Sequence, residues 1–451
     1  MDDELRIVVK EATRDRYARL TRTKIGQKVI ATPNFCTQLQ DSDELDLFIR
    51  LKEHYPSDRL TTNAVRFVDI RRALWRLHPK TPMDVFMQIR KDKYSLFFEN
   101  QVLLIDPSLE YLYYLPRMNG FQTNPYTPTG ILNYLREIEE LKSESEYKLG
   151  KRKAYRSFES KRTTHHRQFW RELADEKSLE SNQKRFEIIR SFVQCGLDYG
   201  ADTLLAPVPL IDSEEMLEVA KKMNDDTKEY ARGKKHCATF LLFKNSVLGD
   251  WALLDKALEY IAENSSESLT VVKFKYLDLT RKDSQTERDN YREFMSNLEF
   301  FSRTFKNRAC LVLENNCQSF VSPLAGFDIV SSSFTNYDIE PSFGKYAPYG
   351  KWLDPKLLIQ RPWKDMKDMY EIHGMLPHGC GYCRSVKVKK LEQLKPDAWY
   401  IVRRGHAVSF MDEWFDYIEK AIEDNKNVEL IVDRLANSKI QILKDLLPRN
   451  W

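Results

Sequence analysis

The stretch that decides the fold runs from residue 238 to residue 276 and reads ATFLLFKNSVLGDWALLDKALEYIAENSSESLTVVKFKY. It opens with the apolar run Ala238–Lys244 and continues into Trp251–Asn264, where apolar residues recur at helical spacing. It closes with Thr270–Tyr276, a second run rich in β-branched residues. A strand, an amphipathic helix and another strand in this order predict a βαβ unit of a parallel sheet.

The same alternation extends over most of the chain. Eight runs that resemble strands favour an α/β fold of the (β/α)8 TIM-like barrel type over an open sheet, although one run could instead belong to a β-ribbon. We assign residues 1–354 to this catalytic barrel. The eight runs are Val29–Phe35, Ala64–Ile70, Val102–Ser108, Ala201–Val208, Ala238–Lys244, Thr270–Tyr276, Ala309–Asn315 and Phe327–Ser333.

Composition narrows the class of protein. Of 451 residues, 42% are hydrophobic and 31% are charged, which is typical of a folded chain rather than a disordered one. The net charge of +4 excludes a uniformly basic protein but leaves room for a local basic patch. No run is long and apolar enough for a membrane span, and seven cysteines argue against a disulfide framework. We therefore expect a cytoplasmic protein without a membrane partner.

A helical, basic insertion at about residues 131–184 interrupts the repeat. Between Lys151 and Arg171, eight Lys or Arg residues stand against a single acid, Glu159, and aromatic residues are interleaved with them. Such a cluster can neutralise phosphates and stack on unpaired bases, although a solvated helix face is the alternative interpretation. The predicted nucleic-acid contacts are Lys151, Arg152, Lys153, Arg156, Lys161, Arg162 and Arg167.

Residues 355–451 are expected to form an appended zinc-binding subdomain with C-terminal helices. Its motif is H-x-C-x-x-C, followed after 22 residues by a second His. Two thiolates and two imidazoles suit a tetrahedral Zn²⁺ ion, and four protein ligands predict a structural rather than a catalytic site. The alternatives are a redox-active Cys pair and two buried thiols with unrelated histidines, and His373 competes with the first His. The predicted ligands are His378, Cys380, Cys383 and His406.

Four separated pieces, in the expected order, resemble the tRNA-guanine transglycosylase superfamily of (β/α)8 enzymes, which exchange guanine in nucleic acid for a deazaguanine base. RLTRTKIGQKVIATPNF (residues 19–35) is similar to the family's opening hairpin, and KRFEIIRSFVQCGLDYGADTLLAPVP (184–209) to its helix and Gly-Ala-Asp strand. AGFDIVSSSF (325–334) resembles the strand that carries the nucleophile. The fourth piece is the metal motif, in which His378 stands at the family's first Cys.

The departures from the family pattern point to one branch. Of the family's Asp-Ser-Gly-Gly-Phe-Gln motif, only Asp106 remains, in LLIDPSLEYL. The position of the family's base-reading Asp falls within APVP, which contains no Asp. With the basic insertion, these changes resemble the DpdA-type branch, which inserts deazaguanine into DNA. The resemblance implies exchange of guanine in DNA for a 7-deazaguanine base, such as 7-cyano-7-deazaguanine, through a covalent Asp-linked intermediate. It also implies DNA and the free deazaguanine base as partners, and it leaves open whether accessory DNA-opening proteins take part.

Base exchange with retention requires a carboxylate nucleophile and a second group that moves protons. In a (β/α)8 barrel both would lie at the C-terminal ends of the strands. Asp106 directly follows an apolar run, and the resemblance makes it the acid/base residue, with a helix N-cap as the alternative. Alignment with the family places Ser331 at the nucleophile position, so we predict Asp338, just beyond that strand, as nucleophile, with Asp328 in reserve.

Two other functions stay open at this point. One is a tRNA-guanine transglycosylase that modifies RNA, and the other is a non-catalytic, zinc-stabilised barrel that binds nucleic acid. Ser331 at the nucleophile position would suit the non-catalytic protein. The sequence lacks a GxxxxGK phosphate loop, so Zn²⁺ is the only cofactor that we expect.

Overall fold

The computed structural model describes part of the chain, and every structural statement below concerns that part. The described residues are 6–12, 19–25, 28–32, 34–39, 65–69, 102–107, 127–198, 200–244, 247, 250–264, 269–275, 311–314, 323, 327–333, 351–354, 359–423, 431, 433, 435 and 437. Side chains are described for fewer of them, and those of residues 145–159 are outside this set.

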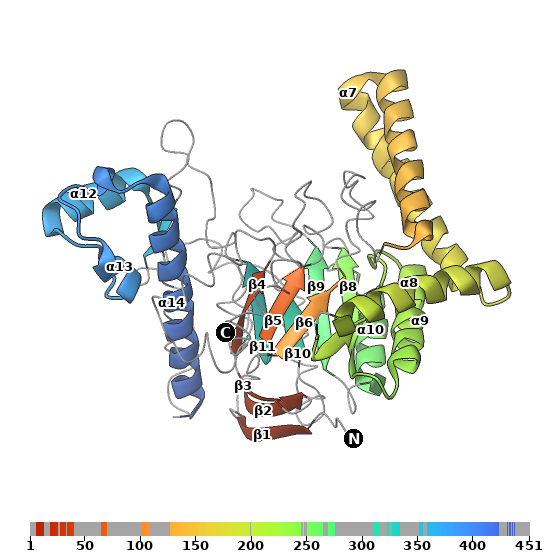
Figure 1. The fold of residues 1–451 in the computed structure, drawn as a ribbon, viewed down its shortest axis with the longest axis horizontal. Coiled ribbons are helices and arrows are strands. Elements are labelled where there is room, and N and C mark those ends of the chain that lie inside the picture. The colour runs from red at the N-terminus through yellow and green to blue at the C-terminus, as the bar shows by residue number, and fades with distance from the viewer. Residues whose placement is uncertain are drawn as a thin grey trace.

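A closed barrel of eight parallel strands lies at the centre of the molecule (Figure 1). The strands follow one another around the barrel in chain order, and β11 closes it by pairing with β4. The mixed α/β class with a parallel sheet is therefore confirmed. The barrel strands are β4 (Asn34–Leu39), β5 (Val65–Asp69), β6 (Val102–Asp106), β7 (Thr203–Leu205), β8 (Cys237–Lys244), β9 (Thr270–Lys275), β10 (Leu311–Glu314) and β11 (Ile329–Ser333).

The prediction of the first barrel strand at Val29–Phe35 is wrong, because this stretch spans two different strands. Its first part belongs to β3 (Lys28–Thr32), which forms an antiparallel sheet with β2 (Arg19–Ile25) and β1 (Arg6–Ala12), while β4 begins at Asn34. Pro33, which separates the two strands in the sequence, has no N–H to donate to a ladder. Because β4 follows β3 so closely, the small sheet lies at the N-terminal end of the barrel.

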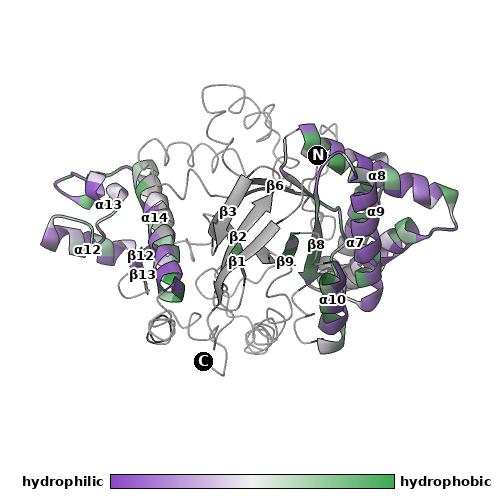
Figure 2. Cartoon of the chain, turned by 90° about the horizontal axis from the view of Figure 1, so that it is seen from below, coloured by the Kyte–Doolittle hydropathy of each residue, from purple (hydrophilic) through white to green (hydrophobic). Residues whose placement is uncertain are grey.

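Amphipathic helices connect the strands from β6 to β9. They are α8 (Leu179–Asp198), α9 (Glu214–Ala231) and α10 (Trp251–Asn264). Ser213 caps α9 by accepting a hydrogen bond from the Met216 N–H, and Glu214 and Glu215 favour the positive end of the helix dipole. Figure 2 shows hydrophilic residues along α9 and hydrophobic ones along β8. The other connections of the barrel lie outside the described residues.

A side-chain clip ties α9 to the barrel wall. The Asn224 amide donates to the Phe240 carbonyl at 2.8 Å, and the Phe240 N–H donates to the Asn224 side-chain oxygen at 2.9 Å. Both residues are buried, so these two hydrogen bonds satisfy polar atoms that water cannot reach. The two hydrogen bonds therefore fix the position of α9 along β8.

The predicted helical insertion contains α7 (Thr129–Ala174), the longest helix among the described residues, which precedes α8 and extends well beyond the barrel in Figure 1. None of the helices that the structure describes combines the length and apolar character needed to cross a membrane.

The C-terminal part begins with an antiparallel ribbon and continues as helices. The buried carboxylate of Asp354 pairs with Arg361 across the ribbon, at 2.6 Å from Nη2. Helix α14 (Pro396–Glu423) also contacts β1, β2 and β4, which connects the C-terminal part to the N-terminal end of the barrel. The boundary at residue 354 stays a prediction. The elements are β12 (Lys351–Asp354), β13 (Ile359–Pro362), α12 (Trp363–His373), α13 (Gly381–Ser385), the short 3-10 helix η7 (Leu391–Gln393) and α14 (Pro396–Glu423).

Candidate metal centre

Three elements bring the predicted metal ligands together. Helix α12 ends at Gly374, whose φ of 66° is left-handed and allows the chain to turn into the loop that carries His378. Cys380 caps α13, where its sulfur accepts a hydrogen bond from the Cys383 N–H at 3.5 Å. His406 lies near the middle of α14, so the loop, a single helical turn and a long helix each contribute to the site.

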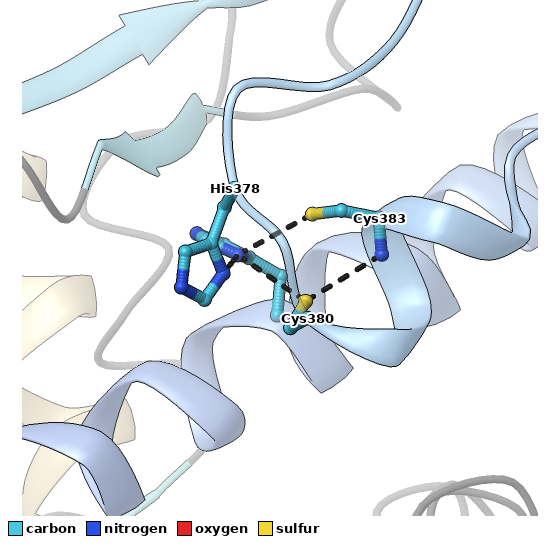
Figure 3. A group of neighbouring side chains, drawn as sticks. His378, Cys380 and Cys383 are labelled. Atoms are coloured by element: carbon cyan, nitrogen blue, oxygen red, sulfur yellow. Dashed lines mark hydrogen bonds between the residues drawn. The ribbon is translucent and has the colours of Figure 1, made fainter.

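The four side chains form a compact group whose ligand atoms all lie within 4.8 Å of one another. Nδ1 of His406 is 3.0 Å from Nδ1 of His378, 3.5 Å from the Cys383 sulfur and 3.8 Å from the Cys380 sulfur. Figure 3 shows His378, Cys380 and Cys383 converging. Tetrahedral metal sites with sulfur and nitrogen ligands have ligand–ligand distances of about 3.5 Å. The group could therefore hold a metal ion, whereas His373 is exposed and lies outside it.

In the metal-free group, the surrounding hydrogen bonds favour Cys380 as a thiolate and Cys383 as a thiol. The pKa of Cys380 is held well below its usual range, first by a hydrogen bond from Cys383 and then by the imidazoles of His378 and His406. The pKa of Cys383 is raised because this thiol donates to Cys380 and is buried. Burial lowers the pKa of His378, but hydrogen bonds with Cys380 and Glu413 outweigh it and raise the pKa to about 9.

Two residues outside the predicted set orient the ligands. Nε2 of His378 lies 3.1 Å from a carboxylate oxygen of Glu413, and the Trp352 ring stacks on His406 with centroids 4.2 Å apart. A carboxylate on the far nitrogen of a ligating His fixes its ring orientation. The signal for Glu413 was present in the sequence, because it lies seven residues after His406 and hence on the same helix face. Trp352 had no such local signal.

Comparison with known proteins gives no family. No protein-family model matches the chain, and no curated protein matches its sequence.

The candidate catalytic Asp106 is the last residue of β6, which places it at the C-terminal end of the barrel. The neighbouring strand β5 ends in Asp69, and the two aspartates are direct partners in the parallel register. Asp69 was not among the predicted site residues, although it lies inside a predicted strand. The signal was the shared pattern FVD and LID, in which an acid follows an apolar run in both strands.

The other catalytic candidates have separate positions. Asp328 is buried, with 1% exposure, and directly precedes β11, whose first residue pairs with Asn34 at the start of β4. It therefore lies at the N-terminal end of the barrel. Ser331 lies inside β11, in register with Glu314 at the end of β10. Asp338 lies outside the described residues.

The predicted nucleic-acid contacts all lie in α7 but differ in their surroundings. Lys161 is exposed, Arg162 is buried, and Nε of Arg167 donates to the carboxylate of Asp212 at 3.2 Å. For the remaining members, Lys151, Arg152, Lys153 and Arg156, only the helical backbone is described.

Proposed function

We propose that this protein is a transglycosylase that exchanges guanine in DNA for a 7-deazaguanine base, and that its barrel is of the (β/α)8 TIM type. One observation carries the proposal. Asp69 and Asp106 end two adjacent parallel strands in the same register, at the end of the barrel opposite the β1–β3 sheet. Active sites of (β/α)8 enzymes occupy this C-terminal end.

Paired positions on adjacent parallel strands lie close enough in the backbone to supply the two carboxyl groups of a retaining exchange. Neighbouring strands lie about 4.8 Å apart, and the paired carboxyl groups of retaining glycosidases are about 5 to 5.5 Å apart. One carboxylate would attack C1′ of the deoxyribose, while the other group protonates the departing guanine. The second group would then remove the proton from the incoming base, whose nitrogen attacks C1′ and releases the first carboxylate.

The roles follow from resemblance and position. The family resemblance assigns acid/base chemistry to Asp106, so the second carboxylate becomes the nucleophile. Asp69 now joins Asp338 as a candidate for that role, with Asp328 in reserve at the opposite end of the barrel. The target nucleotide would have to leave the duplex, at a cost of a few kcal/mol, to which accessory DNA-opening proteins could contribute.

The proposed metal is Zn²⁺, held by His378, Cys380, Cys383 and His406. Two thiolates and two imidazoles are a donor set that Zn²⁺ prefers, and four protein ligands leave no position for substrate. The ion would be structural, and its contribution would be to hold the loop and α13 against α14.

The test is nucleoside analysis of DNA and RNA from cells that express the protein and contain 7-cyano-7-deazaguanine. The variants are Asp69→Asn, Asp106→Asn, Asp338→Asn and Asp328→Asn, because Asn keeps the shape but loses the charge. The matched control is Asp202→Asn, just before β7 at the N-terminal end of the barrel. Asp106→Asn and one of the nucleophile candidates should lose modification by several orders of magnitude.

The outcomes separate the alternatives. Deazaguanine in RNA alone would favour the tRNA enzyme. Zinc and DNA binding without modification would favour the non-catalytic barrel. Normal modification by all four variants would overturn the carboxylate mechanism, and activity loss in Asp328→Asn alone would overturn the assignment of the C-terminal end.

A further inference from the structure

Helix α7 folds back on itself. In a straight helix, Tyr134 and His166 would lie about 48 Å apart, yet the Tyr134 hydroxyl is 3.4 Å from Nδ1 of His166. The Tyr134 ring also stacks on His165, and Nε2 of His165 pairs with Glu137 at 2.9 Å. These contacts require two antiparallel arms, and the Tyr134–His166 pair is centred on Gly150.

The base of this hairpin is fixed to the rest of the protein. The Thr129 N–H donates to Glu187 on α8, Arg167 pairs with Asp212, and Arg171 pairs with Glu215 on α9. From His165 to Gly150 the second arm extends by about 20 Å. In Figure 1 the hairpin rises on the side of the barrel opposite the β1–β3 sheet, which is the side of the C-terminal strand ends.

The basic residues of α7 divide into two groups along this hairpin. Near the base, Arg162 is buried, and Arg167 and Arg171 have carboxylate partners within the protein. The first arm, residues 129–147, contains five acids and two basic residues: Glu137, Glu139, Glu140, Glu144 and Glu146, with Arg136 and Lys142. The sequence around the reversal differs, because residues 148–156 contain no acid and five basic residues: Lys148, Lys151, Arg152, Lys153 and Arg156.

We propose that residues 148–156, the hairpin tip, bind the sugar-phosphate backbone of the DNA whose target base enters the C-terminal end of the barrel. This inference rests on the proposed function and narrows the predicted contact region from the whole basic cluster to its tip. Along the duplex axis, one strand presents a phosphate about every 3.4 Å, so several phosphates fall within reach of nine residues of chain. The three arginines near the base would then contribute to the structure of α7 instead of to DNA binding.

The experiment compares two triple variants of the full-length protein. The tip variant is Lys151→Gln, Arg152→Gln and Lys153→Gln. The matched control is Arg136→Gln, Lys142→Gln and Arg190→Gln, which removes the same charge from exposed positions outside the tip. Binding of a labelled DNA duplex with an unpaired guanine is measured against salt concentration. Circular dichroism and zinc content establish that both variants are folded.

We expect the slope of log Kd against log salt concentration to fall by about two to three in the tip variant and by less than one in the control. Equal decreases in the two variants, or an unchanged slope in the tip variant, would overturn the inference and leave the proposed function standing. A wild-type protein that modifies DNA and binds it without any salt dependence would also overturn it. If the wild-type protein neither binds nor modifies DNA, both proposals fail.

Discussion

Glu413 shows how one residue can set the chemistry of a site to which it contributes no ligand. Its carboxylate lies 3.1 Å from Nε2 of His378, which leaves Nδ1 of that ring directed at His406. The Glu413 side chain is about half exposed, so solvent screens its charge. Its main effect is therefore to orient the His378 ring rather than to stabilise it electrostatically. We therefore expect it to act as a positioning residue for the metal ligand.

The Glu413→Ala variant should bind Zn²⁺ about 10-fold more weakly, because His378 loses the partner that orients its ring. Glu413→Gln should lose less, since the amide oxygen still accepts from Nε2. Competition with a chromophoric chelator measures the affinity, and Glu423→Ala, at the exposed end of α14, is the control. Wild-type affinity in Glu413→Ala would contradict the positioning role.

The described cysteines should differ strongly in their reactivity. Burial raises the pKa of Cys237 to about 12 and also raises the pKa of Cys195, whereas the pKa of Cys380 is lowered. Only the thiolate is nucleophilic, so at pH 8 Cys195 and Cys237 remain protonated and inert. After metal removal, brief iodoacetamide treatment and peptide mapping should find Cys380 modified before Cys195 and Cys237. Faster modification of Cys237 in the folded protein would contradict this order.

At the scale of elements, α13 lies so close to α14 that one position requires glycine. A Cβ atom added to Gly405 would lie 2.5 Å from the ring of Tyr382, which is buried in α13. The close contact places Cys383 and His406, the neighbours of these two residues in sequence, within reach of one metal ion.

Gly405→Ala reverses the usual effect of this substitution. Helix propensity alone predicts a gain of up to about 1 kcal/mol, but overpacking against Tyr382 should cost about 1 to 3 kcal/mol. Gly130→Ala in α7 is the control, because nothing lies within 4 Å of its Cβ, and it should be neutral or stabilising. Urea unfolding measures both. A Gly405→Ala protein as stable as wild type would show that the two helices separate easily.

At the scale of the whole molecule, helix α14 connects the candidate metal centre to parts of the chain that are distant in sequence. Helix α14 carries His406 and also contacts β1, β2 and β4 at the N-terminal end of the barrel. Structural zinc contributes folding free energy directly. Loss of the metal should therefore loosen the C-terminal helices before the barrel helices.

We expect about one Zn²⁺ per chain, and little in Cys380→Ala or Cys383→Ala. Chelation should increase hydrogen exchange in α12, α13 and α14, whereas α8, α9 and α10 should keep their protection. Metal analysis and exchange measured by mass spectrometry test this. Folded, metal-free wild-type protein, or a uniform increase across the chain, would show that the group does not hold a structural zinc.

Local patterns in the sequence were sufficient for several elements and for the residues of the candidate metal centre. Ala238–Lys244 predicted all but the first residue of β8, and Trp251–Asn264 predicted α10 with the same bounds. The H-x-C-x-x-C spacing identified Cys380 and Cys383, which lie within one turn at the start of α13. Side-chain periodicity and close spacing depend on neighbouring residues alone, so the sequence carries them directly.

Only the tertiary structure decided which distant residues meet. The register that pairs Asp69 with Asp106, the reversal of α7 near Gly150 and the partner of Arg167 all depend on contacts between segments far apart in the chain. A basic residue in an intramolecular ion pair and one that faces solvent look the same in a sequence. Their difference is set by the acidic groups that folding brings beside them, because charge interactions depend on distance in space rather than on position along the chain.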